Sequence, residues 1–144
     1  MQLYELSDRR KRWNALLLIL FCFIAVTGCS SLNMREKLDE SINQYNDLLR
    51  RRMMGEASHF TVDSLRREFE ARAKASEGSR IADYRVVDVK FDKEKSEAEA
   101  RVEIDYYSLS TFRMKTLTDT QKWAFLGEGG SKKWRLMSPL PEFK

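Results

Sequence analysis

The apolar residues of this chain change their spacing twice, and each spacing marks a different kind of segment. An unbroken apolar run comes first, at residues 15–26. From Met34 to Met53 apolar residues then recur every three or four positions, as on one face of a helix. From Ile81 onward apolar and polar residues alternate, as along strands with one buried face. The pattern predicts an N-terminal apolar segment, then helices, then strands.

The helical region predicts two helices. Asn33 and Glu36 have the spacing of a capping box, and they open a predicted amphipathic helix of about 20 residues. Residues 55–60 interrupt the pattern, and Thr61 is a suitable N-cap for a second helix that Gly78 can end. The two apolar faces consist of Met34, Leu38, Ile42, Tyr45, Leu49 and Met53 on the first helix and of Val62, Leu65, Phe69 and Ala73 on the second.

The alternating region predicts four antiparallel strands in one meander. The first strand has Val87 and Val89 on its buried side and ends at a turn at 93–96. A second reversal at 108–111 leads into a long strand, and Gly129-Gly130 predicts a tight turn before the last one.

The positions of the turns predict which residues face each other. A reversal centred on residues 109 and 110 pairs Asp105 with Arg113, so that opposite charges share one face. A two-residue loop at the glycines predicts the pairs Phe125–Trp134 and Trp123–Leu136, on the face that meets the first helix.

The apolar run at 15–26 is too short for a membrane span, because a helix needs about 20 apolar residues to cross a bilayer. Four cationic residues, 9–12, precede it, which is typical of a secretory signal peptide. Val26-Thr27-Gly28-Cys29 follows directly and resembles the lipobox of bacterial lipoproteins. The alternative is a short, uncleaved transmembrane anchor with an incidental cysteine.

The lipobox resemblance implies that signal peptidase II cleaves between Gly28 and Cys29. The Cys29 thiol would carry a diacylglyceryl group, and its new amine would be acylated with a fatty acid such as palmitate. Ser30 stands where an aspartate would favour retention in the inner membrane, which points to the outer membrane and the periplasm.

The expected organisation follows from the cleavage site. Residues 1–28 form the signal peptide, residues 29–32 the lipidated N-terminus and a short tether, and residues 33–144 a single domain.

Composition excludes several classes of protein. The chain has 26 Lys and Arg and 22 Asp and Glu; residues 1–28 hold 4 and 2 of these, so the remainder carries 22 against 20. This balance argues against nucleic-acid binding. The single histidine excludes a multi-histidine metal site, and the two cysteines exclude a disulfide scaffold. We expect no metal and no cofactor, since the sequence has no glycine-rich phosphate loop or other cofactor motif.

The order of two helices and a meander resembles the nuclear transport factor two-like superfamily, which includes ketosteroid isomerase. The resemblance covers about residues 33–138, and its most suggestive part is the last hairpin, with Gln121-Lys122-Trp123 on one arm and Lys133-Trp134-Arg135-Leu136 on the other. It implies an α+β fold in which two N-terminal helices pack on a curved, four-stranded antiparallel meander that forms a cone.

No recognisable catalytic motif is present. We expect His59 in an exposed loop, and Arg50 to Arg52 fan out around a helix, which favours a solvated face over one cationic patch. Enzymes of the resembled superfamily use a carboxylate or histidine inside the cone, often with a tyrosine. By alternation Asp105 lies on the charged face of its strand. The residues that line either a pocket or the core are Tyr106, Trp123, Phe125 and Trp134.

Three functions remain open. The leading hypothesis is a non-enzymatic lipoprotein, held to the membrane by its lipid and facing the periplasm, that binds a partner protein or an apolar small ligand. The second is an isomerase- or dehydratase-like enzyme with a pocket inside the cone. The third resembles the inner-membrane core component of type IV secretion systems, which keeps an uncleaved N-terminal anchor.

Overall fold

The computed structural model describes residues 29–143, with side chains from Asn33 onward except at Gly130. The chain divides into two compact units, one up to Met34 and one from Arg35 onward, and the contacts discussed below lie within the second. The expected signal peptide, Gly28 included, lies outside the described residues, as does the side chain of Cys29. No helix in the described part is both long enough and apolar enough to cross a bilayer.

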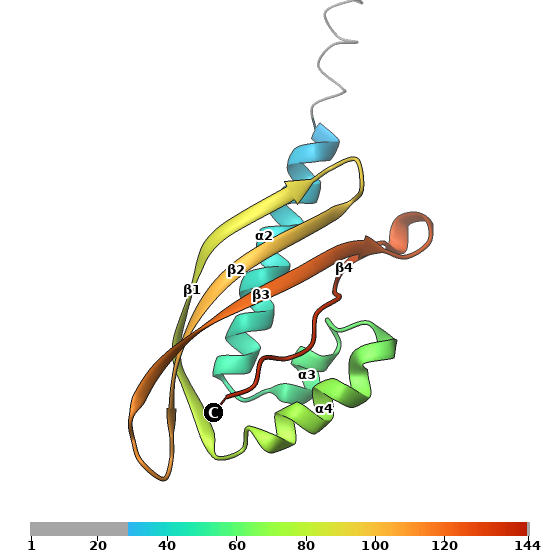
Figure 1. The fold of residues 1–144 in the computed structure, drawn as a ribbon. Helices are drawn as coiled ribbons and strands as arrows, with labels where there is room; N and C mark the ends of the chain where they lie inside the picture. Colours follow the sequence, from blue (N-terminus) through green and yellow to red (C-terminus); the bar gives the residue numbers. More distant parts are fainter. Residues whose placement is uncertain (1–28, 144) are drawn as a thin grey trace, which may run out of the picture. The chain divides into compact units, whose positions relative to one another are not determined.

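Three α-helices precede the sheet in the described part of the chain (Figure 1). They are α2 (Cys29–Arg50), α3 (Met54–Ser58) and α4 (Arg66–Ala75), and a 3-10 turn at Asp63–Leu65 leads into α4. The first predicted helix is confirmed, but it begins before Asn33, which therefore lies inside α2 and is not its N-cap. The prediction of two helices missed α3, a single turn that follows the left-handed residue Arg52 (φ 63°).

The predicted meander is confirmed as one antiparallel sheet in the order β1-β2-β3-β4. Its strands are β1 (Ser79–Asp92), β2 (Glu97–Ser108), β3 (Met114–Leu126) and β4 (Lys133–Leu136). The strands β1 and β4 lie at the two edges and do not pair with each other, so the sheet is open.

The predicted register of the last hairpin is confirmed. Trp123 pairs with Leu136 and Phe125 with Trp134. The predicted two-residue loop is wrong, however. The last pair is Leu126–Lys133, and the residues between them include a 3-10 turn at Gly129–Ser131. The pairing was right because the longer loop has the same centre as the two glycines.

The predicted register of β2 and β3 is wrong. Asp105 pairs with Thr116, not with Arg113, which lies outside β3. The loop is longer than a tight reversal, because the Phe112 backbone N–H donates to the Ser108 carbonyl at 2.8 Å and Phe112 takes a positive φ of 52°. Residues 109–113 are used in the turn, and the pairing moves along β3.

The prediction for the first strand is also wrong in part. The register of β1 shifts between Ile81 and Asp83 and again between Val86 and Asp88. Such bulges exchange the two faces of a strand. Val87 is therefore exposed, and Val86 pairs with the buried Val102.

Thr61 does not cap a helix. It forms a bridge to Leu136 of β4, and the Val62 backbone N–H donates to the Leu136 carbonyl at 3.1 Å. The Leu136 N–H in turn donates to the Phe60 carbonyl at 2.7 Å. The segment between α3 and α4 is thus attached to the last strand. The predicted helix cap would not have formed this attachment.

The core lies between α2 and one face of the sheet. The rings of Tyr45 on α2 and Trp123 on β3 meet edge to face with centroids 5.8 Å apart, and Phe60 completes the group at 6.2 Å from Trp123. The predicted contact between this face and the first helix is confirmed. Its fully buried apolar members include Leu38, Ile42, Leu49, Ala100, Val102, Ile104, Leu136 and Leu140.

The C-terminal segment after β4 turns back between the sheet and the short helices (Figure 1). The Met137 N–H donates to the Lys122 carbonyl at 2.7 Å, and the carbonyl of the fully buried Leu140 accepts a bond from Arg72 at 2.8 Å. Phe143 lies edge-on against Tyr106 with ring centroids 5.2 Å apart. The tail therefore covers part of the sheet face on which Tyr106 lies.

Replacement of Trp134 by alanine should lower the free energy of unfolding by about 3–5 kcal/mol, because the side chain is only 3% exposed and the cavity cannot refill. Chemical denaturation of the chain measures this. Leu126→Ala, on the exposed side of the same hairpin, is the control, with an expected loss within about 0.5 kcal/mol. Equal losses for both variants would contradict the packing described.

Candidate functional site

The four aromatic residues expected in a pocket or a core are mostly buried. Tyr106, Trp123 and Trp134 have exposed fractions of 6%, 1% and 3%, and Phe125 is half-buried. Asp105 lies on the other face, where its carboxylate accepts a bond from the Thr116 hydroxyl. Three of these rings therefore belong to the core, and Phe125 is partly exposed.

A buried polar cluster joins α2 to β3 beside this core. The Asn46 and Gln121 amides exchange two hydrogen bonds, of 3.2 and 2.9 Å, and Gln121 Nε2 also donates to Asp119 Oδ2 at 3.0 Å. Asn46 Nδ2 donates further to the Ile42 carbonyl at 2.8 Å. Paired amides satisfy each other in a dry interior, so the cluster fixes the position of the helix on the sheet.

Asp119 is the acidic member of this cluster, and it is 7% exposed. Burial raises the pKa of its carboxyl to about 6. The hydrogen bond from Gln121 lowers this pKa, but its effect is smaller than that of burial. Burial, and the nearby Asp119, also raise the pKa of Tyr45. A carboxylate beside a tyrosine is the arrangement that the enzyme hypothesis needs, but neither residue lines the main clefts in the described part of the chain.

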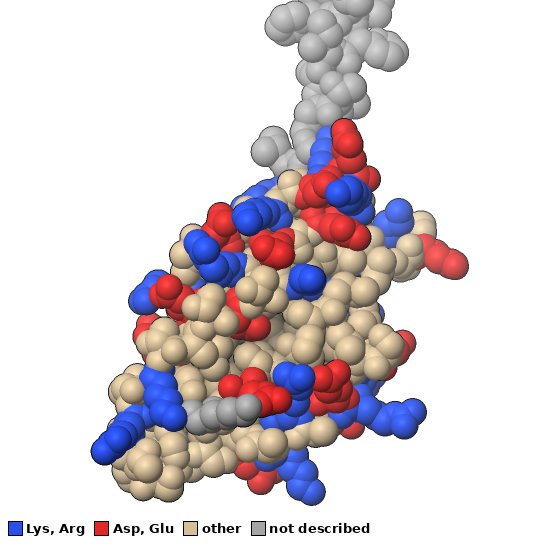
Figure 2. Space-filling view, viewed as in Figure 1, with Lys and Arg blue, Asp and Glu red and all other residues tan. Residues whose placement is uncertain are grey.

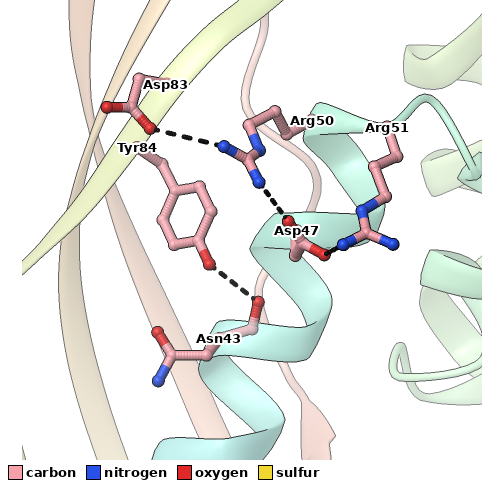
Figure 3. A network of polar contacts seen from close by, with 6 residues as sticks. All are labelled: Asn43, Asp47, Arg50, Arg51, Asp83 and Tyr84. Atoms are coloured by element: carbon pink, nitrogen blue, oxygen red, sulfur yellow. Dashed lines mark hydrogen bonds and ion pairs between the residues drawn. The ribbon is translucent and has the colours of Figure 1, made fainter.

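The arginines at the end of α2 are engaged within the protein (Figure 3). Arg50 and Arg51 bind the two carboxylate oxygens of Asp47 at 2.7 and 2.8 Å, and Arg50 also lies 3.9 Å from Asp83. The Tyr84 hydroxyl donates to the backbone carbonyl of Asn43 at 3.1 Å. These contacts hold the end of α2 against β1, and they support a structural role for Arg50 and Arg51 in place of a lipid contact.

A cleft of about 590 Å³ lies between α2, the loop after α3 and the β3–β4 hairpin. This volume is within the range of small-molecule sites, roughly 300–1,000 Å³. Phe125 and Trp134 line it and are 5.3 Å apart between ring centroids. The remaining lining residues are Lys37, Glu40, Ser41, Gln44, His59, Phe60, Lys132, Lys133 and Arg135. We call it the basic cleft.

The charge of the basic cleft is unbalanced. Lys37, Lys132, Lys133 and Arg135 face one carboxylate, that of Glu40. Within the described residues none of these four cations has a carboxylate within ion-pair distance, whereas ion pairs occur at several other places, such as Arg35–Asp39 and Arg72–Glu68. Figure 2 shows the usual arrangement, with acidic and basic groups interspersed over much of the face drawn. The cleft can therefore attract an anion.

His59 is exposed, as expected, at the end of α3, and it lines the basic cleft. Its carbonyl accepts a hydrogen bond from the Arg135 guanidinium, which holds the loop against β4. The sequence showed the cations of the last hairpin, but it gave no sign that Lys37 and His59 would join them. That arrangement depends on the placement of α2 along the sheet.

A second cleft, of about 360 Å³, lies between α3, α4 and the start of β1. Its floor includes Leu49 and Phe69, and its rim has two cations, Arg52 and Lys74, and two carboxylates, Glu70 and Glu77. The balanced rim gives no preference for a charged ligand. The described residues contain no cluster of three His, Cys, Asp or Glu side chains suited to a metal ion.

Comparisons with known proteins give no relative. No family model, no curated protein and no solved structure matches the chain.

Asp119 should make the stability of the domain depend on pH. Its folded pKa of about 6 lies above the ordinary value of 3.8. Its contribution to the free energy of unfolding is therefore fully present below pH 3.8 and is lost as pH rises through 6. The loss amounts to about 3 kcal/mol, and Asp119→Asn should remove it. Urea unfolding of both proteins from pH 4 to pH 7 tests this through the difference between the two curves. A difference that stays constant across this range would refute the assignment.

Proposed function

We propose that the chain is a bacterial lipoprotein, anchored through Cys29, whose domain faces the periplasm and binds a ligand without catalysing a reaction. The lipobox at 26–29 and the short apolar run before it support the anchor. The proposed lipidated cysteine is the first residue of α2, which runs from Cys29 to Arg50. Ser30 supports the outer membrane as the destination.

The single observation that carries the binding role is the excess of cations in the basic cleft, none of which forms an ion pair with a described carboxylate. Protein surfaces normally pair or disperse such charges, and here four of them surround two aromatic rings. The absence of a catalytic motif in the sequence supports binding over catalysis, as does the burial of Asp119. The order of helices and strands supports a member of the nuclear transport factor two-like superfamily, with an open sheet in place of a closed cone.

An isomerase- or dehydratase-like enzyme is the second candidate, and one observation favours it. The Asp119 carboxyl has a raised pKa and lies near the Tyr45 hydroxyl. A carboxyl group and a tyrosine are the kind of acid–base pair that such chemistry uses. Catalysis would require the C-terminal segment or α2 to move, because the Asp119 carboxyl is buried.

The hypothesis of a secretion-system component differs from both of these, because it requires an uncleaved N-terminus.

Replacement of Cys29 by serine should abolish lipid attachment. A thiolate is the nucleophile that forms the thioether, and serine supplies no equivalent. Cells that express the variant should accumulate the precursor and incorporate no labelled palmitate into it, as seen on a gel after membrane extraction. Cys22→Ser, within the same apolar run, is the matched control and should be processed normally. Labelling that persists in Cys29→Ser would sink the proposal.

A further inference from the structure

We infer that the basic cleft binds an anionic phosphate monoester carried by a molecule with an apolar body. This inference rests on the proposed binding role and names the chemistry of the ligand. Its basis is the arrangement of cations and aromatic rings in one cleft, formed from three separate parts of the chain.

The cations favour phosphate over a neutral headgroup. Lys37 on α2 and Lys132 and Lys133 beside β4 line the same cleft, and none is consumed by an ion pair with a described residue. Lysine binds phosphate as a point charge, and several such charges around one concavity raise the local concentration of an anion. Glu40 is the single carboxylate in the lining and leaves a clear positive excess.

The aromatic rings favour a ligand that is more than an inorganic ion. Phe60, Phe125 and Trp134 line the cleft, and Phe60 and Phe125 are half-buried. Apolar surface of this kind gains free energy when it is covered by an acyl chain or a ring. A phosphate joined to an apolar body satisfies both parts of the cleft, as a lipid headgroup with the first part of its chains would.

The cleft is built on elements that do not need to move. Trp123 and Trp134 fix the hairpin in the core, and the Arg135 guanidinium attaches the His59 loop to β4. A cleft that is largely formed before binding loses little conformational freedom when the ligand enters.

The test is a titration of the full chain, extracted from membranes in neutral detergent, with three probes. These are inorganic phosphate, dihexanoylphosphatidic acid and dihexanoylphosphatidylcholine, and binding is followed by calorimetry and by tryptophan fluorescence. We expect the phosphatidic acid to bind at least about tenfold more tightly than the phosphatidylcholine, and the preference to weaken as salt is added.

The double variant Lys132→Gln/Lys133→Gln should weaken phosphatidic acid binding at least about tenfold, because two charge-assisted contacts are lost. Both side chains are exposed, so the fold should be unaffected. The matched control is Lys74→Gln/Lys93→Gln, which removes the same charge from exposed positions outside the basic cleft and should bind as the wild type does.

Each outcome decides something. Tighter binding of phosphatidic acid than of inorganic phosphate supports a phosphate with an apolar body, and equal binding of the two would contradict the part assigned to the aromatic rings. Equal binding of phosphatidic acid and phosphatidylcholine, no binding of any probe, or an equal loss in the control variant would overturn the inference. Labelling of Cys29 is measured separately, so a failure of the anchor and a failure of the cleft are distinguishable.

Discussion

The packing of α2 on the sheet is the constraint on which the rest of the structure depends. The sheet is open and would expose its apolar face without the helix. Apolar contact supplies most of the free energy, since the rings of Tyr45 and Trp123 and the neighbouring aliphatic side chains are almost completely buried. Apolar contact alone allows a helix to slide, whereas the paired amides of Asn46 and Gln121 allow one position. That position brings Lys37 to the hairpin cations.

The sequence predicted those parts of the fold that depend on local pattern. Periodicity placed the strands, and the glycines at 129 and 130 gave the register of the last hairpin because its loop is symmetric about them. The β2–β3 register was missed because Phe112 adopts a left-handed backbone, which an aromatic residue rarely does. The prediction of Thr61 as a helix N-cap was wrong because Thr61 forms a bridge to β4 instead. At Thr61 tertiary structure overrode a sound local signal, whereas at Phe112 an unusual turn conformation changed the register.

The candidate site shows the same division. Single residues such as His59 and the aromatic pair of the last hairpin were visible in the sequence, but the basic cleft was not. Asp119 was missed although a signal existed, because the two-residue spacing from Trp123 through Gln121 to Asp119 places all three on the buried face of β3. Net charge was no guide either, because an overall balance of acidic and basic residues conceals a local excess.

We propose that α2 serves two purposes, because it begins at Cys29, the proposed site of lipid attachment, and its later turns pack on the sheet. The intact mass of the wild-type chain extracted from membranes tests this most directly. The account predicts a chain that has lost residues 1–28 and gained the mass of a diacylglyceryl group and a fatty acyl group on Cys29. An unmodified mass of 17.0 kDa, that of all 144 residues, would contradict it and would favour an uncleaved N-terminal anchor.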